Sequence, residues 1–317
     1  MSKTFIKEIK AETKIQSFFG VAKKNVRKTK DGKTYLDLDL IDKTGRINAK
    51  MWENADKYKE LFTEGDSVAV EGTAILFSNK IQLKIFKIRL VNEDDKNYGF
   101  KMNDIIPSSL NDIEEMWQFI NEKVNSLTNG YLQKLIANIF IKYEAELKTY
   151  PAAMVLHHAF RGGLLEHTYN MVKIADFISI AYPEADRNLL IAGVILHDIG
   201  KLRELSPGVN ISYTDEGNFI GHLVIGRDIL VEEVRDIPDF PDELKVKMEH
   251  IILAHQGKLE WSSPREPKFL EAMLVYHIDE MDTRVAQLKT AIEKDESEGN
   301  WTDKRNYFSR ILYKGDK

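Results

Sequence analysis

The chain has 317 residues and a net charge of −5. Its length predicts two domains, and its 43% apolar composition is ordinary for a globular protein. It contains no cysteine, which excludes disulfides, thiolate metal sites and cysteine nucleophiles. It has no run of about 18 apolar residues that would span a membrane, and its lysine-rich N-terminus lacks the apolar core of a signal peptide, so we expect a cytoplasmic protein.

The first 90 residues predict a small β-barrel. Apolar and polar residues alternate over 34–42 and again over 43–52, which is typical of half-buried strands. A short helix is expected over 56–62, and two or three further strands over 65–91, with a hairpin turn near residues 78–79. Strands, a short helix and further strands within this length indicate an OB-type barrel.

This region also carries a basic segment, KKNVRKTKDGK, at residues 23–33. Small barrels of this type bind single strands through a basic groove and aromatic stacking platforms. The candidates for nucleic-acid binding are Lys23, Lys24, Arg27, Lys28, Tyr35 and Trp52, with Phe18, Phe19, Lys30, Lys33 and Phe77 as further possibilities. The alternatives are a solvated hairpin loop for the basic segment and a core position for Trp52.

Charge is distributed unevenly along the chain. Residues 1–95 hold 19 Lys and Arg against 15 Asp and Glu, whereas the remainder holds 26 against 35. The difference is either random scatter or the mark of one domain that meets a polyanion and another that holds cations.

Residues 93–108 are acidic and polar and end near a proline, so we expect a linker between a first domain at 1–92 and a second at 109–317. The second domain predicts an all-α bundle. Its first helix shows apolar residues at the three-and-four spacing of a helix face, from Ile113 to Val124. Further helices are expected at 129–148, 163–182, 186–198, 221–235, 241–255 and 266–295. The sequence does not decide whether the tail, 296–317, docks.

All eight histidines lie between residues 157 and 277, and imidazole binds divalent metals well at neutral pH. The segment VILHDIGK places His197 and Asp198 directly after a strongly apolar helix. Burying an unpaired carboxylate costs several kcal/mol, so Asp198 needs a cation or strong hydrogen bonds. A divalent metal would satisfy both side chains; the alternative is a helix-capping aspartate beside a core histidine.

Four more candidate ligands lie on, or at the end of, separate predicted helices: His167, His222, His255 and Asp279. Ligands that converge from facing helices are a recurrent way to build a metal site in a bundle. Asp198 is the natural bridge if two ions lie about 3.5–4 Å apart.

The pattern His167, His197-Asp198 and Asp279 resembles that of the HD-domain metal-dependent phosphohydrolases. More narrowly, the segments HHAFRGGLLEHT, LHDIGK, GHLVIG and ILAHQGKLEWSSPREPKFLEAMLVYHIDEMD are similar to those of the YhaM-type 3′-to-5′ exoribonucleases. In that family an OB domain precedes an HD domain, and the resemblance spans roughly residues 15–290.

The resemblance implies one ion held by His167, His197, Asp198 and Asp279, and a second held by Asp198, His222 and His255. It implies manganese, as one or two ions, and His and Asp ligands also accept Fe, Co, Ni or Zn. Related sequences often read His-His-Gly where this chain has His255-Gln256-Gly257, a departure that bears on the second ion.

Lys201 follows the His-Asp pair and would attract a phosphate as a point charge, so we assign Asp198 and Lys201 as catalytic. The alternative for Lys201 is a solvated lysine at a helix C-terminus. His157 and His158 lie near the site or have a structural role, and Arg161 is a weaker phosphate candidate. We expect His250 to be structural and His277 to belong to the core or the surface.

No residue pattern indicates a covalent nucleophile, so we expect a metal-activated water to attack a phosphate ester. The resemblance implies hydrolysis of single-stranded RNA, and of single-stranded DNA as a further possibility, from the 3′ end to 5′ mononucleotides. One alternative is a phosphohydrolase acting on nucleotides or cyclic nucleotides. Another is a nucleic-acid-binding protein with an inactive HD domain, which the complete ligand set disfavours. The sequence does not predict the oligomeric state.

Overall fold

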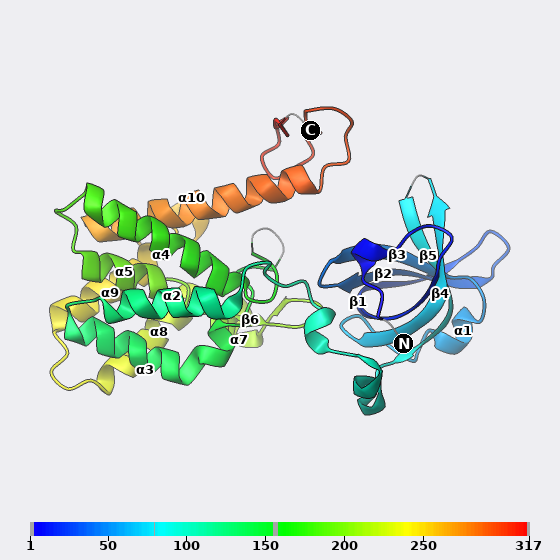
Figure 1. The fold of residues 1–317 in the computed structure, drawn as a ribbon. Coiled ribbons are helices and arrows are strands. Elements are labelled where there is room, and N and C mark those ends of the chain that lie inside the picture. The colour runs from blue at the N-terminus through cyan, green and yellow to red at the C-terminus, as the bar shows by residue number, and fades with distance from the viewer. Residues whose placement is uncertain (1–2, 79, 155–157, 316–317) are drawn as a thin grey trace. The chain divides into compact units, whose positions relative to one another are not determined.

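A computed structural model describes residues 3–78, 80–154 and 158–315 (Figure 1). The chain divides into two compact units. The first holds the residues up to Ser108 together with Pro207–Ile211, and the second holds Ser109–Ser206 and the residues from Ser212 onward. The stretch expected to be a linker, 93–108, forms two 3₁₀ turns within the first unit, η2 (Glu93–Tyr98) and η3 (Met102–Asp104).

The first unit is a closed five-stranded barrel, which confirms the predicted OB-type fold. Its strands are β1 (Lys14–Lys28), β2 (Thr34–Asp42), β3 (Gly45–Met51), β4 (Ser67–Phe77) and β5 (Lys80–Leu90), in the order β1-β2-β3-β5-β4. The 3₁₀ turn η1 (Ile6–Glu8) precedes them, and α1 (Ala55–Tyr58) joins β3 to β4. A parallel pairing of β3 with β5 closes the barrel. Asn79, in the expected hairpin turn, lies outside the described residues, and Ser78 beside it has a left-handed backbone (φ 49°).

Strict alternation along the strands fills the barrel. In β2 the side chains of Leu36, Leu38 and Leu40 are fully buried, whereas the residues between them point outward. The same period in β3 buries Ile47, Ala49 and Met51. One face of each strand is therefore left for contacts outside the core.

The second unit is a helical bundle, as the sequence predicts. Its long helices are α2 (Ile113–Asn125), α3 (Gly130–Leu147), α4 (Gly163–Ala181), α5 (Arg187–Leu196), α8 (His222–Arg235), α9 (Asp242–Ala254) and α10 (Leu270–Glu293). Shorter elements between them are α6 (Lys201–Glu204), the hairpin β6 (Leu205–Ser206) and β7 (Ser212–Tyr213), α7 (Asp215–Phe219) and η4 (Leu259–Trp261). Among the described residues, no helix combines the length and apolarity needed to cross a bilayer.

Helix α5 is the central element of the bundle. Every residue from Leu189 to Leu196 is buried, and the Asp186 side chain caps the start of the helix by accepting hydrogen bonds from two backbone N–H groups. Gly193 lets other helices approach closely, because a Cβ there would lie 3.0 Å from the Ile251 side chain of α9 and 3.2 Å from that of Val275 of α10. The residues that follow α5 are thus delivered to the middle of the bundle.

The C-terminal tail folds back on itself beyond α10. Trp301 and Tyr313 form an isolated β-bridge, and the Lys314 ammonium lies 2.9 Å from an Asp295 carboxylate oxygen. Asp295 also accepts the backbone N–H of Asp303. The tail is therefore an ordered loop tied to the end of α10.

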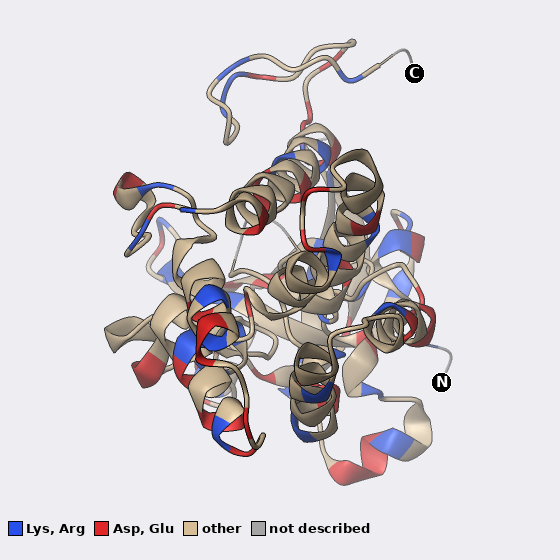
Figure 2. Cartoon of the chain, turned by 90° about the vertical axis from the view of Figure 1, so that its left-hand side faces the viewer, with Lys and Arg blue, Asp and Glu red and all other residues tan. Residues whose placement is uncertain are grey.

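Lys and Arg positions alternate with Asp and Glu positions along the helices (Figure 2). The acidic excess of this part of the sequence is therefore spread over many positions. Only a small number of its carboxylates lie at the histidine cluster described next.

Candidate metal centre and nucleic-acid interface

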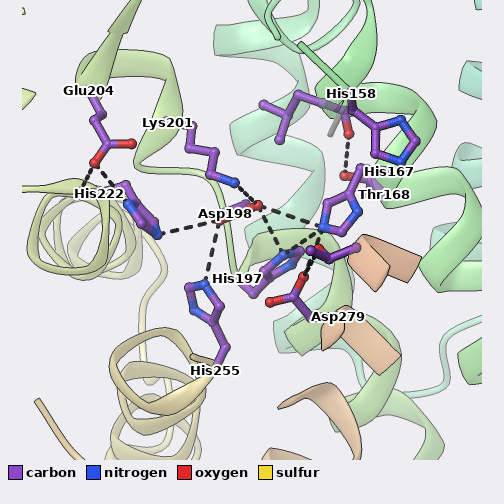
Figure 3. A network of polar contacts seen from close by, with 12 residues as sticks. His158, His167, Thr168, His197, Asp198, Lys201, Glu204, His222, His255 and Asp279 are labelled. Carbon is purple, nitrogen blue, oxygen red and sulfur yellow. Dashed lines mark hydrogen bonds and ion pairs between the residues drawn. The ribbon is translucent and has the colours of Figure 1, made fainter. Parts of the chain in front are cut away.

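The six side chains predicted as ligands converge at the centre of the helical unit (Figure 3). They come from five places in the fold: His167 from α4, His197 and Asp198 from the residues after α5, His222 from the start of α8, His255 from the end of α9, and Asp279 from α10. His167, His197, Asp198 and His255 are at most 3% exposed. The structure thus brings together residues that lie up to 112 positions apart in the sequence.

Asp198 lies between two groups of donor atoms (Figure 3). On one side, His167 Nε2 is 3.3 Å from both His197 Nε2 and Asp279 Oδ1, and His197 Nε2 is 3.2 Å from Asp198 Oδ2. On the other side, Asp198 Oδ1 is 3.7 Å from His222 Nε2 and 3.5 Å from His255 Nε2. Separations of this size are those of atoms that share one ion at bonds of about 2.0–2.2 Å.

Each of the four histidines is oriented by its other ring nitrogen. Nδ1 of His197 lies 2.8 Å from the Val194 carbonyl oxygen, and Nδ1 of His255 lies 2.8 Å from that of Ile252. Because a carbonyl only accepts, the proton is on Nδ1 and the Nε2 lone pair faces Asp198. Carboxylates orient the other two rings, Asp282 for His167 at 2.7 Å and Glu204 for His222 at 2.9 Å. This is the arrangement found behind metal-binding histidines.

The electrostatics of the cluster also favour a cation. Asp198 Oδ1 is buried and accepts no hydrogen bond from any residue that the structure describes. Nε2 of His255 and Nε2 of His222 lie 3.5 Å and 3.7 Å from it, and both direct lone pairs towards it. A buried carboxylate surrounded by acceptors is unfavourable unless a positive charge lies among them. The residues therefore fit a divalent metal ion, with imidazole nitrogens and hard carboxylate oxygens as ligands.

Charge compensation holds the carboxylates ionised. Burial raises the pKa of Asp198, but the Lys201 ammonium and His197 outweigh burial and hold it well below its usual range. Burial also raises the pKa of Asp279, but its hydrogen bond to His167 and the nearby His197 outweigh burial and hold that pKa well below its usual range. Burial lowers the pKa of His167, but its hydrogen bonds to Asp279 and Asp282 raise it to about 9. In the metal-free protein a proton on His167 therefore takes the place of part of the ion's charge.

Lys201 belongs to the centre. It pairs with Asp198 and is mostly buried, so its interpretation as a solvated lysine is wrong. Its ammonium lies 2.6 Å from Asp198 Oδ2, its side chain is 12% exposed, and it lines the pocket above the cluster. The lysine is held where a phosphate bound at the centre would meet it.

The histidines that were not predicted as ligands lie in different environments. His158 Nε2 lies 3.0 Å from Asp282 Oδ2, behind His167, whereas His157 lies outside the described residues. His250 Nε2 accepts the backbone N–H of Lys268, which fits its expected structural role, and His277 is exposed. The backbone carbonyl of Arg161 accepts a hydrogen bond from the backbone N–H of Ser109.

Sequence reasoning missed two groups that complete the centre, Glu204 and Asp282, and it did not give the contact that Gln256 makes. Asp282 lies one helical turn after Asp279, a spacing that shares a face and was a signal available in the sequence. Glu204 accepts hydrogen bonds from both the ring and the backbone N–H of His222. The two residues are too far apart in the sequence for a helix or strand period to relate them. Gln256 Nε2 lies 3.3 Å from His222 Nε2.

A pocket of about 380 Å³ opens above the centre. Asp198, Lys201 and His255 lie among the residues that line it. Four aromatic side chains and one arginine line it as well: Tyr213, Trp261, Tyr276, Tyr307 and Arg284. A cavity of this volume, lined by both polar groups and aromatic rings, accepts a small organic molecule.

On the barrel, an aromatic platform lies on the outer face of β2 and β3. The rings of Tyr35 and Trp52 stack with their centroids 4.4 Å apart, and Lys50 Nζ lies 5.7 Å and 5.5 Å from them. Trp52 is 42% exposed, so it does not belong to the core. This strand surface is where OB barrels bind oligonucleotides.

The basic segment divides between the two faces of β1. Residues 23–28 continue β1, and only the residues after them form the turn. Lys23 and Arg27 pair with Asp39 and Tyr35 of β2 and so share the outer face with the platform. Lys28 and Lys24 point to the opposite side.

The Lys24 ammonium donates to the carbonyl oxygens of Lys59 and Phe62 and lies over the Phe62 ring. Phe18 and Phe19 are buried, so the idea that they stack on bases is wrong, whereas Phe77 is exposed.

Comparison with known proteins agrees with both units. Residues 164–284 match the family model described as HD domain, and residues 21–91 match the one described as OB-fold nucleic acid binding domain. The 3′-5′ exoribonuclease YhaM of Geobacillus sp. (strain WCH70) is 36% identical over 264 residues, which cover 83% of this chain and 80% of that protein. The protein of the same name from Bacillus subtilis (strain 168) is 35% identical over 264 residues, covering 83% of each chain.

The raised pKa of His167 predicts how metal affinity depends on pH. A metal must displace the Nε2 proton, so between pH 6.5 and 8.5 the affinity for Mn²⁺ should rise about tenfold per pH unit, as expected for release of one proton. Calorimetric titration at three pH values measures this. His250→Gln, a control remote from the ligands, should keep the slope. An affinity independent of pH over this range would contradict the assignment of His167.

Without metal, the same proton stabilises the fold. The folded pKa of His167, about 9, lies above the ordinary value of 6.5, so this contribution is complete below pH 6.5 and is lost as the pH rises through 9. In chelator, the free energy of unfolding should fall by about 3 kcal/mol over that interval. Urea unfolding of wild type and of His167→Gln at both pH values measures it, and an equal fall in the two proteins would contradict it.

Proposed function

The chain belongs to the YhaM family of 3′-5′ exoribonucleases, and on that basis we propose that it removes nucleotides from the 3′ end of single-stranded RNA and releases 5′ mononucleotides. The observation that carries the proposal is the convergence of four histidines and two aspartates, of which Asp198, His222, His255 and Asp279 line a pocket. The barrel with an exposed aromatic platform adds a surface suited to a single strand.

The proposed metal is manganese, as two ions on either side of Asp198. His167, His197, Asp198 and Asp279 would hold the first, and Asp198, His222 and His255 the second. When bound, such ions supply Lewis acidity, which activates the attacking water at neutral pH and neutralises the phosphate oxygens. The mixed nitrogen and oxygen ligands suit manganese among other first-row ions.

The remaining work falls to the chain's own groups. Asp198 holds Lys201 at 2.6 Å, so the ammonium lies beside the place of the scissile phosphate and attracts its charge. Glu204 and Asp282 fix two imidazole rings, so the ligands need no reorganisation when substrate arrives. The leaving group is the 3′ oxygen of the preceding nucleotide.

The pocket also bears on the choice of substrate. Its volume of about 380 Å³ suits one nucleotide at a time. A strand end enters such a pocket readily, whereas the paired end of a duplex is too wide. We therefore propose that hydrolysis requires a free single-stranded end.

Gln256 is proposed as part of the second metal position. Its amide nitrogen lies 3.3 Å from His222 Nε2, and its oxygen is buried without a hydrogen-bond donor among the described residues. The two ends of an amide have the same shape, so a half-turn exchanges them and presents oxygen on the side of His222. Gln256, which stands where related sequences often carry histidine, would then still offer a ligand atom.

A 5′-labelled single-stranded RNA tests the function itself. With Mn²⁺ we expect a ladder of products shortened from the 3′ end, together with 5′ mononucleotides. An alternative activity, hydrolysis of nucleotides or cyclic nucleotides, would leave the strand intact and consume those small molecules instead. Binding of the strand without metal-dependent cleavage of any substrate would indicate an inactive helical domain.

Asp198→Asn should reduce RNA hydrolysis to below about one-thousandth, because both metal positions lose their shared charge. Binding of the strand should be nearly unchanged, which fluorescence anisotropy measures. Asp236→Asn, at an exposed position, is the matched control and should behave as wild type. Normal turnover in Asp198→Asn would remove the metal centre from the mechanism.

Gln256→Ala should lower the number of Mn²⁺ ions bound per chain from two to one, since the second position loses a ligand. Gln256→His should keep two ions because imidazole also binds the metal. Metal analysis after gel filtration gives the numbers directly. Two ions in Gln256→Ala would show that Gln256 contributes no ligand.

Trp52→Ala should weaken binding of a 20-nucleotide strand by about tenfold, as expected for loss of one stacked base. Cleavage of a dinucleotide, which is too short to need the platform, should be unaffected. Tyr98→Ala removes another exposed ring of the same unit, outside the platform, and serves as the control. A loss equal for both substrates would exclude the platform as the strand-binding surface.

A further inference from the structure

The wall of the pocket holds groups that the hydrolysis leaves unused. Helix α10 presents Asp279, Thr283 and Gln287 at a spacing of four residues, and all three line the pocket. Thr283 Oγ1 lies 3.3 Å from Asp279 Oδ1, which places the first two on one face. Gln287 lies about 12 Å beyond Asp279 along the helix axis. The helix therefore connects the metal centre to a second polar group within the same pocket.

Gln287 is a buried polar side chain without a complete set of partners. The residue is only 5% exposed, and its amide oxygen accepts no hydrogen bond from any described residue. Buried amides are almost always hydrogen-bonded, and each exception requires an explanation. Since Gln287 borders the pocket, a donor on a bound molecule supplies that explanation.

Tyr307 contributes the neighbouring surface. It comes from the C-terminal tail, is 49% exposed, and its ring centroid lies 5.6 Å from Arg284 Cζ. The tail is anchored to the end of α10 by the ion pair between Lys314 and Asp295. An aromatic face is thus held in position at the pocket, where a base can stack on it.

The chemistry of the acceptor narrows the choice of partner. An exonuclease that shortens strands of any sequence meets four bases, whose edges offer different donors. Every 3′-terminal nucleotide of RNA carries the same 2′- and 3′-hydroxyl groups, and both donate hydrogen bonds. A ribose is therefore the donor that a single glutamine can meet in every cycle.

We propose that Gln287 and Tyr307 form the subsite for the 3′-terminal nucleoside, Gln287 accepting a hydrogen bond from its ribose hydroxyls and Tyr307 stacking on its base. The inference rests on the proposed exonuclease function. Within that function it accounts for recognition of a ribose end, since a chain lacking the terminal hydroxyls leaves the buried amide unpaired.

Three 5′-labelled RNAs that differ only in the terminal sugar test the role of Gln287: ribose, 2′-deoxyribose and 2′,3′-dideoxyribose. Wild type should remove the ribose nucleotide about tenfold faster than the dideoxy nucleotide in the first cleavage. In Gln287→Leu the two rates should come within about twofold, whereas Gln287→Glu, which keeps an acceptor, should retain the preference. Lys289→Ala, on the exposed side of α10, is the matched control.

Tyr307 should affect the same reaction in a different way. Tyr307→Ala should slow removal of all three ends by about tenfold alike, because stacking does not depend on the sugar hydroxyls. Tyr307→Phe keeps the ring and should behave as wild type. A Tyr307→Ala variant as fast as wild type would overturn the stacking role.

Equal rates of wild type on the three ends, or a full preference retained by Gln287→Leu, would overturn the role of Gln287. A wild-type protein that leaves RNA intact would instead refute the proposed function. In that case the subsite is tested by calorimetric binding of adenosine 5′-monophosphate and its 2′,3′-dideoxy form. Tighter binding of the ribose form that disappears in Gln287→Leu supports the subsite, and equal binding overturns it.

Discussion

The buried carboxylate of Asp198 is the constraint on which the helical unit depends. It is 3% exposed and lies among four imidazole rings, and the Lys201 ammonium pairs with one of its oxygens at 2.6 Å. A negative charge in such a place is stable only with a cation beside it. Helices α5 and α9 end at this point, α8 begins there, and Asp282 and Glu204 orient two of the imidazole rings around the carboxylate.

The sequence predicts much of this arrangement. The apolar run of α5 indicates a buried helix with a His-Asp pair at its end. The candidate ligands on the other helices then favour a metal centre over a capping aspartate beside a core histidine. The bounds of the long helices follow to within about four residues from the apolar spacing and the prolines, whereas the short helices α6 and α7 were not expected. The barrel strands can likewise be predicted, because apolar and polar residues alternate along them.

Other features arise only when distant segments meet. Glu204, Gln287 and Tyr307 carry no local pattern, because their roles depend on which helix end or tail segment lies opposite them. The basic segment shows a different limit. From the sequence alone, its basic residues form one patch. Side chains alternate along a strand, so Lys24 and Lys28 lie on the opposite face from Lys23 and Arg27. Tertiary context, and not composition, decides which charges can meet a strand.

A crystal of the full chain grown with Mn²⁺ and measured at the manganese absorption edge tests the central claim most directly. We expect two anomalous peaks about 3.5–4 Å apart, one on each side of Asp198 and each within bonding distance of its oxygens. Peaks confined to other parts of the surface, or none at the histidine cluster under saturating Mn²⁺, would contradict the account.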